Sequence, residues 1–213
     1  MRLNKKLLVL TSVIILLPLI LGSIFWSQLP DTIATHFNIS GQANGFSSKY
    51  YAVFALPSLL LLVHFFCLFM IFQSPKGKNI GSKVIHLVYW LVPLISIIMM
   101  LGVSLPILKI SFKPTLFIGL STGILFLVIG NYLPKIKQNY VVGIRLPWTL
   151  ADEDNWNKTH RLAGKIWVLG SLAILLDSFM QFAFAYVFGA CLVIMIIIPC
   201  VYSFWLSQKE GKD

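Results

Sequence analysis

The side chains that could do chemistry in this chain are few and scattered. His36 and Asp31 share one polar segment, while His64, His86 and His160 stand far apart from one another. No second His, Cys or carboxylate lies near His36 at the spacing of a metal site. No Ser-His-Asp order, carboxylate pair within an apolar run or phosphate-binding glycine loop is present. The sequence therefore predicts no catalytic residue, metal site or cofactor, and we expect a protein that is not an enzyme.

Apolar residues dominate the chain around these groups. They make up 58% of its 213 residues against 11% charged residues, and the mean hydropathy is +0.85. A soluble core cannot use so much apolar surface, so the bilayer must be the solvent. The net charge is +10, and the basic residues lie mostly between the apolar runs, where such residues direct topology and contact lipid headgroups. We expect no direct binding of nucleic acid. The cysteines lie inside apolar runs and predict neither disulfides nor a zinc site.

Six apolar runs have the length needed to cross a bilayer as helices. They cover residues 7–26, 51–72, 85–104, 115–133, 163–179 and 184–206. The first follows basic residues as a signal peptide does, but it is longer and no small-residue cleavage site follows, so we expect an uncleaved helix. The fold class predicted is all-α, a polytopic membrane helix bundle. Only residues 180–183 separate the last two runs, so a five-span or re-entrant arrangement stays open.

The basic residues predict the orientation of the spans. With the N-terminus inside, only Lys49, Lys109 and Lys113 of the 17 basic residues lie outside. This asymmetry follows the positive-inside rule and supports an even number of spans. We therefore predict cytoplasmic N- and C-termini.

Polar residues inside the runs admit two interpretations. His64 and His86 have no carboxylate partner in the spans, and Asp177 lies near the end of its run. We interpret the histidines as hydrogen-bonding residues between helices. A small transporter or channel, with these groups along a pathway, is the alternative. Gly119 and Gly123 form a small-xxx-small pair, which predicts close helix contact.

Two polar loops carry most of the remaining information. In the outer loop, residues 27–50, Gly41 and Gly45 predict tight turns with positive φ and hence a folded segment. In the inner loop, residues 134–163, Thr149 followed three residues later by Asp152 predicts a helix start of the capping-box type. We expect that helix to continue without a break into the fifth span.

The inner loop has two possible roles. Trp148 and Trp156 can anchor at the membrane interface while Arg145 and Arg161 meet lipid phosphates. Alternatively, Arg145, the acidic turn and His160 form a docking surface for a cytoplasmic partner, because exposed loops commonly carry binding groups.

Both loops resemble known families of bacterial membrane proteins. The segment from Leu29-Pro30 to Lys49 resembles an N-terminal domain of unknown function that occurs in small bacterial membrane proteins. The run Gly143-Ile-Arg-Leu-Pro-Trp-Thr-Leu150, then Trp156 and Thr159-His-Arg-Leu-Ala-Gly164, resembles the signature of the SdpI family. The resemblance implies an N-terminal part at 1–84 with two transmembrane helices and the outer loop at 27–50. It implies an SdpI-like part at 85–213 with four transmembrane helices and the inner signature loop at 134–163.

The SdpI resemblance implies a multi-pass protein of the bacterial cell membrane. The best-understood family members are immunity proteins of Gram-positive bacteria against a secreted, membrane-active peptide toxin, and some also bind a small winged-helix autorepressor. The expected partners are thus the lipid bilayer, a peptide toxin and such a repressor. The candidate residues for the inner partner are Gly143, Arg145, Pro147, Trp148, Thr149, Trp156, His160, Arg161 and Gly164. The candidate residues of the outer loop are Pro30, His36, Gly41, Gly45 and Lys49.

Overall fold

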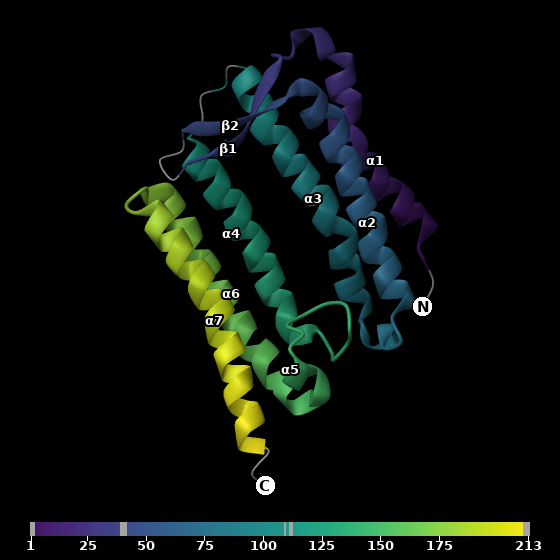
Figure 1. Cartoon of the computed structure of the whole chain (residues 1–213), viewed down its shortest axis with the longest axis vertical. Helices are drawn as coiled ribbons and strands as arrows, with labels where there is room; N and C mark the ends of the chain where they lie inside the picture. The colour runs from purple at the N-terminus through teal and green to yellow at the C-terminus, as the bar shows by residue number, and fades with distance from the viewer. Residues whose placement is uncertain (1–2, 39–41, 109, 111–112, 211–213) are drawn as a thin grey trace. The chain divides into compact units, whose positions relative to one another are not determined.

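Six long helices make up most of the chain. The computed structural model describes residues 3–38, 42–108, 110 and 113–210. The long helices are α1 (Lys5–Ile24), α2 (Leu56–Gln73), α3 (Ser82–Ile107), α4 (Pro114–Tyr132), α6 (Glu153–Met180) and α7 (Phe184–Glu210) (Figure 1). Within the described ranges, six helices are long and apolar enough to cross a membrane. All six predicted runs are confirmed as helices, and α6 and α7 are separate helices rather than one broken span.

The outward faces of the helices are apolar, as a bilayer requires. Leu62 and Phe66 on α2 keep 65% and 63% of their surface exposed, and Leu169 and Leu176 on α6 keep 66% and 65%. Large exposed side chains of this kind are stable against lipid tails and costly in water. The polytopic all-α class predicted from composition is confirmed.

The chain packs as two compact units that interleave along the sequence. Unit 1 comprises residues 1–72 and 85–117, and unit 2 comprises residues 73–84 and 118–213. Unit 1 contains α1, nearly all of α2 and most of α3, and unit 2 contains most of α4 together with α6 and α7. These units are defined by packing contacts. The division into an N-terminal part at 1–84 and an SdpI-like part at 85–213 rests on the family resemblance and stays a prediction.

Unit 1 is held together by polar bonds between its helices. Thr11 Oγ1 on α1 lies 3.0 Å from His64 Nε2 on α2, and both side chains are buried. Ser96 Oγ on α3 donates to the carbonyl of Ile15 at 2.9 Å. The interpretation of His64 as a hydrogen-bonding residue between helices is confirmed, whereas His86 is exposed near the start of α3.

A β-hairpin joins α1 to α2. Strands β1 (Thr32–Phe37) and β2 (Ala43–Ser48) pair antiparallel, with irregular register around His36. The prediction of a folded outer loop is confirmed, but the positive φ predicted for Gly45 is wrong. Gly45 lies in β2 opposite His36, where an added Cβ would come within 2.8 Å of the His36 Cβ. Close approach of the strands, rather than a turn, requires glycine there. Gly41 lies outside the described residues.

An ion pair closes the base of the hairpin. Lys49 Nζ lies 2.9 Å from Asp31 Oδ1 and 4.9 Å from the centre of the Trp26 ring. The Lys49 amide also donates to the carbonyl of Asp31 at 2.9 Å. The Lys49 ammonium holds the pKa of the Asp31 carboxyl below its usual value through a hydrogen bond and charge attraction.

Unit 2 relies on glycines where its helices meet. An added Cβ would come within 2.7 Å of the Leu175 Cγ at Gly123 and within 2.7 Å of the Trp167 Cβ at Gly130. At Gly119 it would overlap Ser178 outright. The close helix contact predicted for Gly119 and Gly123 is therefore confirmed, and it joins α4 to α6. Asp177 is buried, and its carboxylate accepts the amide of Ala183 at 3.3 Å just before α7 begins.

Candidate functional site

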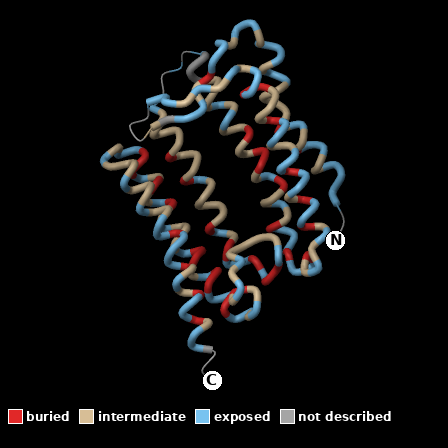
Figure 2. The backbone as a smooth tube through the Cα atoms, in the orientation of Figure 1, coloured by how far each residue is buried: buried red, intermediate tan, exposed pale blue. Residues whose placement is uncertain are grey.

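The signature loop begins where α4 ends and contains its own short helix. A 3-10 turn at Leu133–Lys135 follows α4, and α5 (Pro147–Ala151) precedes α6. Figure 1 shows α5 and the loop beside the N-terminal end of α6, which runs alongside α7. Buried residues gather in this part of unit 2 (Figure 2).

The predicted helix start is wrong by one turn. Asp152, not Thr149, is the N-cap of α6, and its carboxylate accepts the amides of Asp154 at 3.1 Å and Asn155 at 2.8 Å. Thr149 instead lies in α5, where its Oγ1 accepts the amide of Leu146 at 2.9 Å. Thr149 and Asp152 thus mark the starts of two different helices, α5 and α6. From Glu153 the helix continues unbroken to Met180, as predicted.

His160 fastens the loop to α6 through both ring nitrogens. Its Nε2 accepts the amide of Ile144 at 2.9 Å, and its Nδ1 lies 2.8 Å from the Trp156 carbonyl. An amide can only donate and a carbonyl can only accept, so the ring is the neutral tautomer with the proton on Nδ1. Both nitrogens are engaged with the backbone, which leaves neither one for a substrate.

Trp156 and Gly143 complete this buried contact. The Trp156 ring stacks on His160 with centroids 4.1 Å apart, and its Nε1 donates to the carbonyl of Ile136 at 2.7 Å. Gly143 has φ +120°, and an added Cβ would lie 2.5 Å from His160 Nε2 and 3.0 Å from the Trp156 ring. Trp156 is fully buried, so its interpretation as a lipid anchor is wrong.

Two buried amides that sequence reasoning missed hold the loop from within. Asn139 Oδ1 accepts the amides of Val141 and Val142, both at 2.8 Å, in a local turn. Gln138 Nε2 donates to the carbonyls of Thr149 and Leu150, both at 3.0 Å. The pair Gln138-Asn139, shortly after the end of a helical segment, could have predicted this turn from the sequence, because such residues often hydrogen-bond to nearby backbone groups.

The loop between α2 and α3 also packs against the signature loop. Lys76 Nζ donates to Gln138 Oε1 at 2.8 Å and lies 5.2 Å from the centre of the Tyr140 ring. Asn79 Nδ2 donates to the Gln138 carbonyl at 3.0 Å. Two loops about 60 residues apart in sequence therefore lie on one side of unit 2.

The last helix supplies a third support. Trp148 Nε1 donates to Ser203 Oγ at 2.8 Å, and Asn155 Nδ2 donates to the Ser203 carbonyl at 2.9 Å. Trp148 also packs edge-on against Phe204. Gly164 allows Pro134 to approach, because an added Cβ would come within 2.5 Å of the Pro134 Cγ. These contacts join the loop to both α6 and α7.

The structure separates the candidate inner residues into two groups. Buried residues hold the loop: Thr149, Trp156, His160 and Gly164. Gly143 and Trp148 are half-buried, whereas the surface carries Arg145, Pro147 and Arg161. Arg145 Nη1 donates to the carbonyl of Tyr140 at 2.6 Å, so the two exposed side chains Arg145 and Tyr140 are held on the same turn. The arrangement presents a shaped surface without a reactive group.

The candidate outer residues do not form one cluster. His36 is exposed and its Nδ1 lies 2.6 Å from Asn44 Oδ1 across the hairpin. Lys49 closes the hairpin base, and Pro30 precedes β1 and lines a hollow beside that strand. No group of three or more His, Cys, Asp and Glu that could hold a metal ion occurs among the described residues.

Comparison with known proteins finds two family models and one curated relative. Residues 13–61 match the domain of unknown function DUF1648, and residues 135–203 match the SdpI/YfhL protein family. The chain is 25% identical over 209 residues to the immunity protein SdpI of Bacillus subtilis strain 168, covering 96% of this chain and 95% of that protein. No solved structure matches the chain.

The two matched regions lie in different parts of the chain. The DUF1648 match includes the second half of α1, the hairpin and the start of α2, and the SdpI/YfhL match includes most of the signature loop, α6 and most of α7. Together with the six apolar helices among the described residues, these matches support a multi-pass cell-membrane protein that is similar to the SdpI family.

Proposed function

We propose that this chain is an immunity protein that protects a bacterial cell against a secreted, membrane-active peptide toxin. The observation that carries the proposal is the similarity to the immunity protein SdpI over 96% of the chain. Similarity over nearly the full length includes both the hairpin and the signature loop, so it extends beyond a shared membrane anchor.

The proposal assigns the two loops to opposite sides of the membrane. With the N-terminus inside, the hairpin faces the outside, where a secreted peptide arrives, and the signature loop faces the cytoplasm. The bonds of Lys76 and Asn79 to Gln138 support this topology. They join the α2–α3 loop to the loop between α4 and α6, as expected if the two crossings by α3 and α4 return the chain to the same side.

A second part of the proposal concerns signalling through the signature loop. Arg145, Tyr140 and Pro147 are exposed on a loop whose backbone is hydrogen-bonded from within by Gln138, Asn139 and His160. A rigid scaffold presenting a few exposed groups suits recognition by a protein, because little side-chain order must be gained on binding. We assign this surface to a small winged-helix repressor in the cytoplasm.

Coupling between toxin and repressor would need two states of the protein. Toxin can promote repressor binding only if it binds one state more tightly than the other. The Pro18 and Pro199 positions inside α1 and α7 are places where helices bend readily. The alternative, a small transporter or channel, has less support because His64 bonds Thr11 and Asp177 closes the α6–α7 turn.

The experiment that tests immunity is survival of a sensitive strain. We would delete the immunity protein SdpI from Bacillus subtilis strain 168, express this chain in its place, and expose the cells to concentrated culture medium of the parent strain. Survival above that of cells without either protein supports immunity. Survival no better than in those cells, at confirmed membrane expression, contradicts the proposal for the toxins of that medium.

Signalling is tested in the same cells with one pair of variants. Arg145→Ala should weaken derepression of a reporter under repressor control while leaving survival unchanged, and Lys158→Ala, on an exposed part of α6, should change neither. Loss of survival together with the reporter response in Arg145→Ala would contradict the separation of the two surfaces.

A further inference from the structure

The outer edge of β1 presents backbone groups that have no partner strand. The Lys49 amide donates to the Asp31 carbonyl, and the register continues with Ile33 opposite Ser47. In an antiparallel ladder, alternate residues direct both N–H and C=O toward the partner strand and those between direct them away. Thr32 and Ala34 therefore point their N–H and C=O groups away from β2. The sheet contains only β1 and β2 within the described residues.

A hollow of about 410 Å³ runs along this edge. It is lined by three consecutive residues of β1, Thr32, Ile33 and Ala34, and on the other side by Gly102 and Val103 of α3. Successive side chains of a strand point to opposite faces, so a hollow that touches three residues in a row also reaches the backbone between them. The hollow therefore borders Thr32 and Ala34, whose N–H and C=O groups point away from β2.

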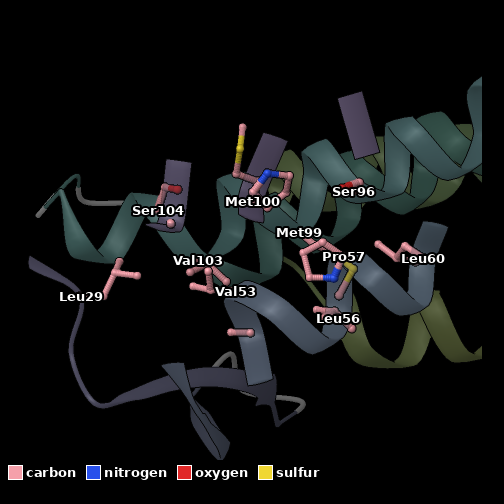
Figure 3. Close-up of a pocket in the computed structure, with 13 residues that line it drawn as sticks. Leu29, Val53, Leu56, Pro57, Leu60, Ser96, Met99, Met100, Val103 and Ser104 are labelled. Atoms are coloured by element: carbon pink, nitrogen blue, oxygen red, sulfur yellow. The ribbon is translucent and has the colours of Figure 1, made fainter. Parts of the chain in front are cut away.

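An apolar pocket adjoins the hollow and shares Leu29 and Val103 with it. The pocket has a volume of about 70 Å³ and lies between Val53 and Leu56 on one side and Met99 and Met100 on the other (Figure 3). Methionines adapt their shape to what they contact. The pocket and the hollow together combine a backbone edge with space for an apolar side chain.

The backbone beside this pocket is unusual. Residues Tyr51–Ala55 form a single π-helical turn before α2, and Ala52 and Val53 from that turn line the pocket. Pro57 lines it too and has no N–H to donate to the carbonyl of Val53, which disturbs regular helix bonding. Single π-turns inside helices occur frequently at functional sites.

We infer that an extended segment of the peptide toxin binds along the β1 edge, hydrogen-bonds to Thr32 and Ala34, and inserts an apolar side chain into the adjoining pocket. This inference rests on the proposed immunity function and names its binding site. Complementary charge selects the occupant, because the edge presents partly positive N–H and partly negative C=O groups. Another peptide backbone matches that alternation, as in strand addition to a sheet edge. A lipid acyl chain carries neither group.

The decisive variants are prolines at two residues that face each other. Ala34 and Phe46 form one pair of the ladder, and both direct their N–H away from the partner strand. Proline at either position removes an outward N–H and no ladder bond, but only Ala34 lines the hollow. We expect Ala34→Pro to lower protection at least tenfold in the survival assay and Phe46→Pro to keep it within twofold, at equal membrane levels.

The outcomes separate the inference from the proposed function. If the wild-type chain gives no protection, the immunity function fails and the inference fails with it. If the wild type protects and the two proline variants protect equally well, or lose protection equally, immunity stands and the β1 edge is overturned as the binding site.

A direct measurement does not depend on how proline affects the hairpin. We would place the photo-crosslinker p-benzoylphenylalanine at Ala34, at Val103 or at Phe46, expose the cells to the same concentrated medium, irradiate them and identify the adducts by mass spectrometry. Peptide adducts at Ala34 and Val103 but not at Phe46 are expected. Lipid adducts alone, or no adduct in cells that are protected, would overturn the inference.

Discussion

The signature loop and the β-hairpin are both polar segments between apolar helices, yet they are stabilised in opposite ways. In the signature loop, buried side chains such as Gln138, Asn139 and His160 bond the backbone over most of its path. In the hairpin, polar contacts lie at the surface, as between His36 and Asn44, and no third strand among the described residues pairs with either edge. One loop uses its polar groups for its own shape, and the other keeps backbone groups available for a partner.

This difference separates structural residues from contact residues within a family signature. Four of the nine candidate residues of the loop, Trp156 and His160 among them, are buried and act on a partner only by positioning the exposed turn. Substitutions in the loop should therefore cost stability first, whereas substitutions in the hairpin should cost little stability. The following expectations test that contrast.

The largest effect is expected for Gly143→Ala. Alanine would have to adopt φ +120° and place its Cβ 2.5 Å from His160 Nε2, which combines backbone strain with overpacking and should cost about 3 kcal/mol. The measurement is the unfolding midpoint of the purified protein in detergent. Gly81→Ala is the matched control, because nothing lies within 4 Å of its added Cβ. Equal midpoints for the two variants would contradict the tight packing of the loop.

A smaller loss is expected for His160→Leu. Leucine fills much of the same space but leaves the partly buried amide of Ile144 without its acceptor, which should cost about 2 kcal/mol. Backbone hydrogen exchange at Ile144 should accelerate in this variant. The neighbouring variant Arg161→Leu changes an exposed side chain and should leave both exchange and stability nearly unchanged. Slow exchange at Ile144 in His160→Leu would show that another group protects it.

Gly45→Ala tests the packing within the hairpin. Its Cβ would come within 2.8 Å of the His36 Cβ, but His36 is exposed and the register is already irregular there. The strands can therefore separate locally, and we expect a cost of about 1 kcal/mol, below that of Gly143→Ala. Hydrogen exchange in β1 and β2 is the measurement. A loss of overall stability as large as that of Gly143→Ala would remove the contrast between the loops.

The smallest effect is expected from the ion pair at the hairpin base. Lys49 lowers the pKa of Asp31 in the folded state. The pair therefore stabilises the hairpin fully when the pH is above the pKa of Asp31 in the unfolded chain, and this stabilisation is lost as the pH falls through the lowered pKa of the folded state. Hydrogen exchange of the hairpin should therefore accelerate in acid in the wild type. In Asp31→Asn this acid dependence should be weaker, and an unchanged pH profile would show that the pair does not support the hairpin.

Local patterns in the sequence predicted the helical framework. Apolar runs of bilayer length predicted the six helices, because hydrophobic length is set by the membrane rather than by distant contacts. Gly119 and Gly123 predicted close helix contact from another local pattern, because small residues at a four-residue spacing share one helix face. The signature motif, with Trp156 and His160, lies within the residues that match the SdpI/YfhL family.

Only the tertiary structure decided what those residues do. The bond from His160 to Ile144 crosses 16 residues, and those from Lys76 to Gln138 and from Trp148 to Ser203 cross 62 and 55. Such partners leave no periodic signal in the sequence, so Trp156 looked like a lipid anchor although it is buried. The same holds for the hairpin, where strand register, which composition does not encode, determines that Thr32 and Ala34 face outward. The sequence by itself determined which segments enter the membrane, and long-range hydrogen bonding decided which polar groups remain available for a partner.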